Sequence, residues 1–479
     1  MYSQKVINRF TNPKFSGEIK NPDAVGEEGN LRCGDIMRIF IKVNNNKISD
    51  IKFQTYGCLP PKEKVLVNEG DWREISKVSN SQVVLDGYGI KTKVKKMFKR
   101  DYKGKLLKFI PFVSPYNSFY ITPEHPILCI QRRNLKKIRK HSKCSWLQTN
   151  NDELMSTQPD YVEAGNLKEG DYLVFSFHKG VKDNKRFTKS FLRLLGYYLA
   201  EGYISAKNGA VAFSFNKNEL KYIEEVKKLI KEITGKDAKF RIRDNVGEVY
   251  INSRDFVRKV VKYGNKLARK KKLSEEIMLL PPKKQIEIVE TFFNGDGNKY
   301  KRRPNNSFTY RLSTTSEKLA IQLQEILARN NIFSSIKKMR MKEGLIEGRR
   351  IKGGEIYEVS YRKKRVHKFF HSTGKSFLVP IKQIKVEDYQ GPVYNFEVTS
   401  NSHSYLVKGF AVHNCVAAIA SSDMLCELAK NKTLNEASKI ESKDIMKELG
   451  EIPAIKAHCS VLGAKALKNA INNYKGAKK

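Results

Sequence analysis

Near the N-terminus, apolar and polar residues follow the pattern of a β hairpin. Residues 36–43 are β-rich and partly alternate, residues 44–47 have the composition of a turn, and residues 48–56 resume the strand pattern. Near the C-terminus, apolar residues recur at helical spacing instead. Helices are predicted at residues 424–430, at residues 445–449 with a cap from Ser442 to Asp444, and along the stripe Val461, Leu462, Leu467, Ala470 and Ile471, which ends near Tyr474. The ends together predict an α+β fold, a small antiparallel sheet covered by helices.

The long middle of the chain contains two other patterns. Short β-rich runs at residues 64–67, 106–113 and 405–407 are typical of strands. Two apolar helical stretches, residues 194–202 and 289–297, lie 95 residues apart. Each has small residues on one face and an acid before a terminal glycine, so each predicts a helix whose backbone can approach the other closely.

Side-by-side packing of these helices would bring Glu201 and Asp296 together at their C-terminal ends. Two close carboxylates repel one another unless a cation lies between them. Mg²⁺ in that position could activate water and stabilise the leaving oxygen of a phosphodiester. Either Lys271 or Lys272 is a candidate for a polarising lysine beside the two acids.

The charge of the chain is concentrated in the same middle segment. Residues 58–414 hold 71 of the 91 Lys and Arg and 37 of the 50 Asp and Glu, which gives this segment +34 of the net +41. A strongly basic globular unit usually binds a polyanion, so DNA or RNA is the expected partner, and a lysine-rich solvated surface is the alternative. Candidate phosphate contacts are the basic stretches 266–272, 299–303, 337–340 and 362–365, beside the candidate strands 213–215 and 308–313.

Apolar runs and cysteine content indicate in which cellular compartment the protein is expected. The N-terminus has no apolar segment typical of a secretory signal, and no apolar run approaches the length of a membrane span. Seven cysteines in 479 residues do not indicate a disulfide scaffold. These features predict a cytoplasmic protein with no membrane contact, whose thiolates serve chemistry or metal binding.

The two boundaries of the basic segment contain reactive residues. Cys58 follows Gly57, and His413 and Asn414 precede Cys415. If residues 58–414 are deleted, the flanks join as Tyr-Gly-Cys-Val-Ala-Ala-Ile-Ala-Ser-Ser, which reads as one continuous small protein. The sequence therefore predicts a precursor in which flanks of 57 and 65 residues are interrupted by an insert of 357 that removes itself.

The residues at the boundaries suit that chemistry. Cys58 can attack the Gly57 carbonyl to form a thioester, Cys415 can take over the acyl group, and Asn414 can cyclise to release the insert. Amide resonance protects the first bond, so the site must distort or protonate it. Activating groups are predicted at Thr122, His125, His403 and His413, although a lone surface histidine is the alternative for each of the three histidines.

These strings resemble the splicing motifs of inteins. The resemblance rests on Cys58-Leu59-Pro60, on residues 121–126, on residues 391–403 and on residues 412–415. It implies an all-β Hint (Hedgehog/intein) horseshoe built from residues 58–185 and 376–414, which splices without a cofactor. Asn395 stands where many inteins have aspartate, so coordination of the early steps would rely on other groups.

The flanks carry three cysteines in chemically suggestive settings. Cys33 precedes a predicted strand beside Asp35, Cys415 follows a strand, and Cys459 follows His458 before a predicted helix. Cysteines with a histidine and an aspartate match the ligands of zinc or an iron–sulfur cluster, and buried structural cysteines are the alternative. Cys426 is better explained as a packed helical cysteine.

The flanks resemble the U-type iron–sulfur cluster scaffold, the IscU/NifU N-terminal family. The matching strings are Cys33-Gly34-Asp35, the joined segment around Cys415, and residues 456–460. The resemblance implies that Cys33, Cys415 and Cys459 hold a nascent [2Fe–2S] cluster or zinc, with Asp35 keeping the cluster labile and His458 as an auxiliary ligand. It also implies a cysteine desulfurase and apo acceptor proteins as partners. Residues 451–456 depart from the Leu-Pro-Pro-Val-Lys segment of the family, which puts recognition of its usual chaperone in doubt.

The paired helices of the insert resemble the LAGLIDADG homing endonucleases, which implies an α/β endonuclease at residues 186–375 with Mg²⁺ at Glu201 and Asp296. Residues 316–332 resemble the helix that follows the second motif, while Thr291 replaces the small residue Gly196 of the first and is expected to loosen the helix contact. A DNA-binding unit without cleavage is the alternative. A single DNA-binding regulator with scattered cysteines is a third reading, but it leaves the continuity of the flanks unexplained.

Overall fold

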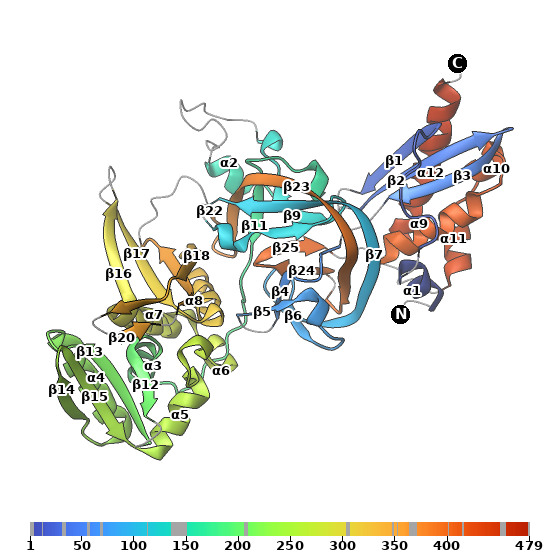
Figure 1. Cartoon of the computed structure of the whole chain (residues 1–479). Helices are drawn as coiled ribbons and strands as arrows, with labels where there is room; N and C mark the ends of the chain where they lie inside the picture. Colours follow the sequence, from blue (N-terminus) through green and yellow to red (C-terminus); the bar gives the residue numbers. More distant parts are fainter. Residues whose placement is uncertain are drawn as a thin grey trace.

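The computed structural model describes residues 4–11, 13–30, 35–54, 58–67, 70–112, 114–135, 151–205, 209–302, 307–346, 349–351, 353–363, 371–400, 402–413, 416–450 and 457–477. Three units follow one another across Figure 1, built around separate sheets. We call them the terminal unit (residues 4–54 and 416–477), the β-rich unit (residues 58–175 and 371–413) and the two-sheet unit (residues 189–361). In the described part of the chain, no helix is both long enough and apolar enough for a membrane span.

The terminal unit is assembled from both ends of the chain. Its three-stranded antiparallel sheet has the order β1 (Ala24–Asn30), β2 (Asp35–Asn44), β3 (Lys47–Gln54), so the predicted hairpin is present. The helices are α1 (Gln4–Thr11), α9 (Val416–Ala429), α10 (Leu434–Ser438), α11 (Ser442–Leu449) and α12 (Ala457–Ala477). The predicted α+β arrangement of the ends is confirmed, because helices from the C-terminal flank lie against a sheet from the N-terminal flank (Figure 1).

One hydrophobic core joins the two flanks. It includes Ile39, Ile51 and Phe53 from the sheet and Leu425 and Leu467 from the helices. An ion pair of 2.7 Å from Arg9 on α1 to the buried Asp423 on α9 adds a polar link. Since removing buried aliphatic side chains costs about 2–5 kcal/mol each, this shared core holds the flanks together while the insert is still present.

Two details of the terminal unit differ from the sequence-based prediction. The cap of α11 is Glu441, whose carboxylate and that of Asp444 form a reciprocal capping box, so the helix begins at Ser442 instead of being capped by it. Cys459 lies in the first turn of α12, which begins at Ala457, and does not precede the helix. Cys426 is buried on α9, and burial raises the pKa of its thiol, as expected of a packed cysteine.

The β-rich unit is a single 12-stranded sheet formed by two separated segments. The first segment gives β4 (Lys64–Val67), β5 (Asp71–Glu74), β6 (Val83–Leu85), β7 (Lys91–Pro111), β8 (Phe119–Ile121), β9 (Pro126–Ile130), β10 (Asp160–Glu163) and β11 (Tyr172–Phe175). The second gives β22 (His371–Ser372), β23 (Phe377–Val398), β24 (Ser404–Val407) and β25 (Phe410–His413). The strands predicted at residues 64–67 and 405–407 are present as β4 and β24, whereas the run at 106–113 is the end of the much longer strand β7, which stops at Pro111.

Pairing between the segments closes this sheet on itself. The long strands β7 and β23 run antiparallel from Ile381 opposite Pro111 to Val398 opposite Val94, and they curve together around the unit (Figure 1). Strand β25 pairs with both β9 and β11. The long-range pairing brings the end of the insert back to its beginning.

The two-sheet unit consists of two halves with the same order of elements. Each half contains a helix, two strands, a second helix and two more strands. Its first half contains α3 (Lys189–Glu201), β12 (Gly202–Ser205), β13 (Ala210–Asn216), α4 (Leu220–Thr234), β14 (Lys239–Arg243) and β15 (Val246–Asn252). Its second half contains α7 (Pro282–Asp296), β16 (Gly297–Arg302), β17 (Ser307–Thr314), α8 (Glu317–Arg329), β18 (Ser334–Met341) and β21 (Gly354–Tyr361). Helices α5 (Arg254–Gly264) and α6 (Glu275–Met278) connect the halves, and β19 (Gly344–Ile346) pairs with β20 (Arg349–Ile351).

The strand orders β12-β13-β15-β14 and β16-β17-β21-β18 are equivalent in the two halves, so each half contains one four-stranded sheet, and the candidate strands at 213–215 and 308–313 lie in β13 and β17. Helices α3 and α7 pack against each other between the halves. Where α3 carries Gly196, a Cβ would lie 2.1 Å from Thr291 Oγ1 and 2.4 Å from the Ile288 carbonyl oxygen. The expectation that Thr291 loosens this contact is wrong, because the threonine fills the space that the glycine leaves open.

Candidate functional sites

The first site lies in the β-rich unit, where the insert begins. Cys58 is buried, and its N–H donates to Thr122 Oγ1 at 3.0 Å. The Thr122 N–H donates in return to the Cys58 carbonyl oxygen at 3.1 Å. A reciprocal pair of backbone hydrogen bonds, each 2.8 Å, joins Leu59 to Tyr394 on β23. The peptide N–H of Cys58, which belongs to the first junction, is therefore held in a fixed position against the turn that precedes β9.

His125 belongs to that turn and is fully buried. Burial lowers the pKa of its imidazole to about 3, and interactions with the backbone at Cys58 and at His413 oppose that shift. The ring is neutral at pH 7 because the folded protein disfavours its charged form. The turn that carries His125 is hydrogen-bonded to Cys58, and Ile127 just after it pairs with Val412, so His125 lies between the two ends of the insert.

The end of the insert is held by the hairpin β24–β25. His413 is the last residue of β25, and its ring meets the edge of the Tyr161 ring at a centroid distance of 4.9 Å. The His403 ring lies 6.2 Å from the His413 ring, between centroids. His403 has a φ of 45°, a left-handed conformation that lets the chain turn sharply before β24.

Asn395 lies beside the β24–β25 hairpin, next to Tyr405 of β24. It is buried on β23, and its Oδ1 accepts hydrogen bonds from the Tyr405 hydroxyl at 3.0 Å and from the Phe396 N–H at 2.7 Å. Tyr405 also packs on Phe396, with ring centroids 4.2 Å apart. Asn395 therefore has a fixed side chain even though it lacks a charge.

Sequence reasoning missed Tyr161, because nothing in the sequence around it connects β10 to β25. Tyr405 could have been suspected, since strand alternation places it on one face of the short run 405–407. Asn414, Cys415 and Cys33 lie outside the described residues, as do the side chains of Asp35, His458 and Cys459. The predicted cluster ligands and the second splicing nucleophile therefore stay predictions.

The second site lies in the two-sheet unit, at the adjoining C-terminal ends of α3 and α7. Glu201 ends α3 and Asp296 ends α7. A Cβ at Gly295 would lie 2.8 Å from Glu201 Cγ, so the Glu201 side chain crosses directly over the helix that carries Asp296. The helix contact thus places the two acids beside each other.

Both carboxyl groups resist ionisation in this position. Burial, and then the neighbouring Asp296, raise the pKa of Glu201 to about 7. Burial raises the pKa of Asp296 to about 6, and the nearby Lys271 opposes the rise. Because the Asp296 side chain is also accessible to solvent, water favours its charged form and limits the size of this upward shift.

Lys271, and not Lys272, is the lysine that belongs to this site. It is buried, and its Nζ donates to the carbonyl oxygens of Tyr198 at 2.8 Å and of Leu199 and Gly202 at 2.9 Å. Burial lowers its pKa to about 8, while Asp296 and Glu201 oppose that shift. Lys272 is exposed. The lysine satisfies the free carbonyls at the end of α3 beside the acids.

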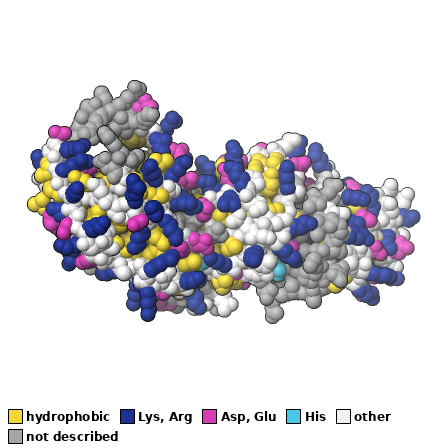
Figure 2. Space-filling view, turned by 90° about the horizontal axis from the view of Figure 1, so that it is seen from below, with side chains coloured by type: hydrophobic (Ala, Val, Ile, Leu, Met, Phe, Trp, Pro, Cys, Tyr) yellow, Lys and Arg dark blue, Asp and Glu magenta, His cyan; other side chains and the backbone are white. Residues whose placement is uncertain are grey.

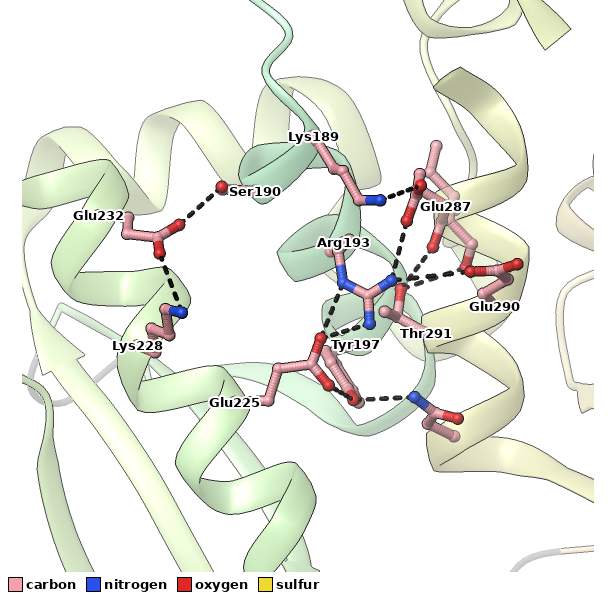
Figure 3. A network of polar contacts seen from close by, with 12 residues as sticks. Lys189, Ser190, Arg193, Tyr197, Glu225, Lys228, Glu232, Glu287, Glu290 and Thr291 are labelled. Atoms are coloured by element: carbon pink, nitrogen blue, oxygen red, sulfur yellow. Dashed lines mark hydrogen bonds and ion pairs between the residues drawn. The ribbon is translucent and has the colours of Figure 1, made fainter. Parts of the chain in front are cut away.

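A network of hydrogen bonds and ion pairs joins α3 to α4 and α7 (Figure 3). Arg193 on α3 donates to Glu225 on α4 and, at 2.8 Å, to Glu287 on α7. Tyr197 donates to Glu225 at 2.7 Å and accepts from Asn294 Nδ2 at 3.0 Å. Asn294 lies two residues before Asp296, so the network fixes α3, α4 and α7 close to the carboxylates.

The surface around the two-sheet unit is basic. Figure 2 shows Lys and Arg side chains spread across the visible face of the molecule, with fewer Asp and Glu. Exposed basic residues occur on strands of both sheets, including Lys239 and Arg243 on β14 and Lys337 and Arg340 on β18.

The two carboxylates of Glu201 and Asp296 are hard oxygen donors of the kind that Mg²⁺ prefers, and phosphate and water oxygens would complete the coordination shell of the ion. In the described ranges, no group of three or more His, Cys, Asp and Glu forms a larger metal site.

The raised pKa of Glu201 predicts a pH dependence of stability. A carboxyl whose pKa is higher in the folded than in the unfolded protein stabilises the fold below its unfolded pKa, and that contribution is lost as pH rises through about 7. Thermal melts without Mg²⁺ should therefore show that Tm falls between pH 5 and 8 by more in the parent chain than in Glu201→Gln. Equal slopes in the two proteins would contradict the raised pKa. Added Mg²⁺ should stabilise the parent most at the high end of this range.

Two family models match this chain. The NifU-like N terminal domain matches residues 1–60 and 397–479, and the LAGLIDADG-like domain matches residues 283–374. The chain thus belongs to the class of proteins in which one domain is inserted into the sequence of another domain. The terminal unit is a NifU-like, IscU-type domain split between the two ends of the chain, and a LAGLIDADG-like domain lies between its halves.

Relatives match different parts of the chain. An iron–sulfur cluster assembly SufBD family protein of Mycobacterium bovis is 34% identical over 378 residues, which cover 77% of this chain and 44% of that protein. The iron–sulfur cluster assembly scaffold protein IscU 1 of Archaeoglobus fulgidus is 57% identical over 58 residues, 12% of this chain and 38% of that protein. The chain thus spans less than half the length of either relative.

Solved structures of homing endonucleases resemble part of the chain. The structure of I-DmoI in complex with DNA and Ca is 14% identical, with a TM-score of 0.28, and the match covers 37% of this chain and 85% of that one. I-WcaI bound to its DNA recognition sequence is 16% identical, with a TM-score of 0.26, over 36% of this chain and 76% of that one.

Proposed function

We propose that this chain is the precursor of an iron–sulfur cluster assembly scaffold, interrupted at Gly57 and Cys415 by a self-splicing intein with an endonuclease inside it. In this proposal the β-rich unit is the Hint horseshoe and residues 186–375 are the endonuclease. The mature scaffold joins residues 1–57 to 415–479. It would receive sulfur from a cysteine desulfurase and pass its cluster to apo acceptor proteins.

The observation that carries the splicing proposal is the position of His125. The turn that carries its buried ring is hydrogen-bonded to Cys58, and strand β9, which follows that turn, pairs with β25 beside His413, although Cys58 and His413 are 355 positions apart in sequence. Splicing requires that groups from both boundaries meet. The placement of Cys58 and His413 near the buried His125 imidazole meets that requirement. The boundary residues themselves, Cys58 and Asn414, supply the reactive groups.

The groups at the first junction suit acyl transfer. Cys58 Sγ attacks the Gly57 carbonyl carbon, the C–N bond breaks, and the freed amine takes a proton. The Thr122 hydroxyl oxygen orients the N–H of that peptide, and the neutral His125 can hand over or accept a proton beside it. The thiol of Cys415 then displaces Cys58 from the thioester, and the acyl group moves to Cys415.

The groups at the second junction suit release of the insert. The Asn414 side-chain nitrogen attacks its own carbonyl carbon, which forms a succinimide and breaks the bond to Cys415. His413 precedes Asn414 in the chain, and its ring centroid lies 6.2 Å from that of His403; in this proposal the two histidines polarise the carbonyl and move the proton. The amine of Cys415 then attacks the Gly57 thioester and leaves a normal peptide bond, so no cofactor is consumed.

For the two-sheet unit we propose site-specific cleavage of double-stranded DNA that encodes the joined scaffold. When bound, Mg²⁺ would supply a Lewis acid for the phosphodiester and an activated water. Glu201 and Asp296 would hold it, and Lys271 would add a positive charge beside the scissile phosphate. The basic strands on both sheets would hold the backbone of the duplex.

Substitution of His125 tests the splicing proposal. The parent chain should yield products of about 41 and 14 kDa by mass spectrometry, in proportion to the 357 and 122 residues of the insert and the joined flanks. His125→Ala should slow cleavage of the Gly57–Cys58 bond by about 100-fold or more, because a proton-transfer group typically contributes at least that factor.

The matched control is His371→Ala, which removes another buried histidine of the same sheet. It should splice at a rate close to that of the parent chain. Equal rates for His125→Ala and the parent would contradict the role given to His125.

A further inference from the structure

Helices α4 and α8 hold equivalent places in the two halves of the two-sheet unit, but their surroundings differ. Helix α4 is amphipathic and exposes Lys221, Glu224 and Lys228 to solvent. On α8, every residue from 319 to 329 is buried, including the polar Gln322, Gln324 and Glu325. Helix α8 packs on its own half of the two-sheet unit and also against the β-rich unit, which it meets at Ile321, Gln324 and Glu325.

Polar contacts fix the start of α8 against the β-rich unit. Glu317 accepts a hydrogen bond from Tyr116 and forms an ion pair with Lys64 on β4. Lys318 forms an ion pair of 2.8 Å with Asp71 on β5. A cavity of about 20 Å³ between the two units, bordered by Gln324, Glu325 and Gly409 among others, has room for about one water molecule. The two units are therefore tightly packed here.

Two buried amides continue this contact into the β-rich unit. Asn117 Nδ2 donates to Gln324 Oε1 at 3.2 Å, and Gln324 Nε2 donates to Asn117 Oδ1 at 3.3 Å. Asn117 Nδ2 also donates to the carbonyl oxygen of Lys408 at 2.9 Å. Buried polar groups of this kind require their partners, because an unsatisfied one costs about 1–3 kcal/mol.

Lys408 forms the turn of the hairpin that ends the insert. Lys408 and Gly409 have φ values of 47° and 93°, the left-handed conformation that a two-residue hairpin turn needs. The Lys408 ammonium group donates to the Ser118 carbonyl and lies 3.5 Å from the carboxylate of the buried Glu63. At the other end of the hairpin, Ser404 pairs with His413. The place of this turn therefore determines the place of His413, since a slip of one residue would turn each side chain to the opposite face.

We propose that Asn117 and Gln324 are positioning residues for the splicing reaction proposed above, on which this inference rests. They connect α8 of the endonuclease to the β24–β25 turn and so place His413, and with it Asn414, for cleavage of the second junction. The endonuclease is then a structural part of the splicing site and not a separable passenger. The backbone of the first junction is held by other contacts, those of Thr122 with Cys58 and of Leu59 with Tyr394, so we expect its reaction to change much less.

The test separates the two junctions in the full chain. In a Cys58→Ala background, release of residues 415–479 reports cyclisation of Asn414. In an Asn414→Ala background, release of residues 1–57 by added dithiothreitol reports thioester formation at Cys58. Gln324→Leu should slow the first reaction by about tenfold or more, the effect of a small displacement of reacting groups, and should leave the second within about twofold.

Gln322→Leu is the matched control. Gln322 is an equally buried amide of α8, but its hydrogen bonds go to the backbone of Leu273 inside the endonuclease. It should leave both reactions within about twofold of the parent. Asn117→Leu combined with Gln324→Leu should slow cyclisation no more than the slower single variant, because both belong to one connection.

Three outcomes would overturn the inference. Equal slowing by Gln324→Leu and Gln322→Leu would indicate a general loss of packing, and equal slowing of both junctions by Gln324→Leu would indicate partial unfolding. Unchanged cyclisation in Gln324→Leu would show that α8 does not place His413. Failure of the proposed function gives a different result, since neither junction would then react in the parent backgrounds.

Discussion

A chain with both Cys58→Ala and Asn414→Ala is expected to remain a single species of about 55 kDa under reducing conditions. Loss of the thiol removes the only nucleophile at the first junction that the proposed reaction uses, and loss of the carboxamide removes the group that cuts the second. The parent chain, expressed in the same way, should give the two shorter products. Mass spectrometry of both proteins is the measurement.

The same double variant is expected to bind no stable [2Fe–2S] cluster, whereas the joined scaffold should give the absorption spectrum of one. Cys415, a proposed cluster ligand, is still bonded to the insert in the variant. The shared core of the flanks, which includes Phe53 and Leu467, is already formed with the insert in place, so unfolding of the scaffold is not the expected cause. Equal cluster spectra from the two proteins would contradict the proposal that splicing completes the cluster site.

DNA cleavage should be lost almost completely in Glu201→Gln and in Asp296→Asn. Each change removes one of the two carboxylates proposed to hold Mg²⁺ at the ends of α3 and α7, and we expect a fall in cleavage rate of about 10³-fold or more, as when a major electrostatic contribution to a transition state is removed. A nicking assay with Mg²⁺ on duplex DNA spanning the joined Gly57 and Cys415 codons is the measurement.

Binding of the same duplex should persist in both variants, because the exposed basic residues of the two sheets are unchanged. Lys221→Met is the control, since Lys221 is exposed on α4 and lies outside both the acid pair and the basic stretches proposed to contact phosphates. It should cleave DNA at nearly the parent rate. If the parent chain binds the duplex but never nicks it, the two-sheet unit is a DNA-binding domain without cleavage.

Local patterns in the sequence predicted most elements near the candidate sites. The hairpin of β2 and β3, the helices that end at Glu201 and Asp296, and the strands β4, β13, β17 and β24 each follow from short-range periodicity. The boundary residues were identifiable because joined flanks read as one protein. The cap of α11 was misplaced by one residue, since Glu441 and Ser442 can both accept from a helix N-terminus.

The sequence alone determined that this chain is composite: one small α+β protein, divided by a basic insert with reactive residues at its boundaries and a repeated helical motif inside. Only the tertiary structure decided which distant side chains meet. Of the two candidate lysines, Lys271 and not Lys272 lies beside the acids, and Thr291 packs against Gly196. Tyr161 contacts His413, and α8 is buried where it meets the β-rich unit. Periodicity is set by neighbours along the chain, whereas these contacts depend on how sheets close and helices pack between residues hundreds of positions apart.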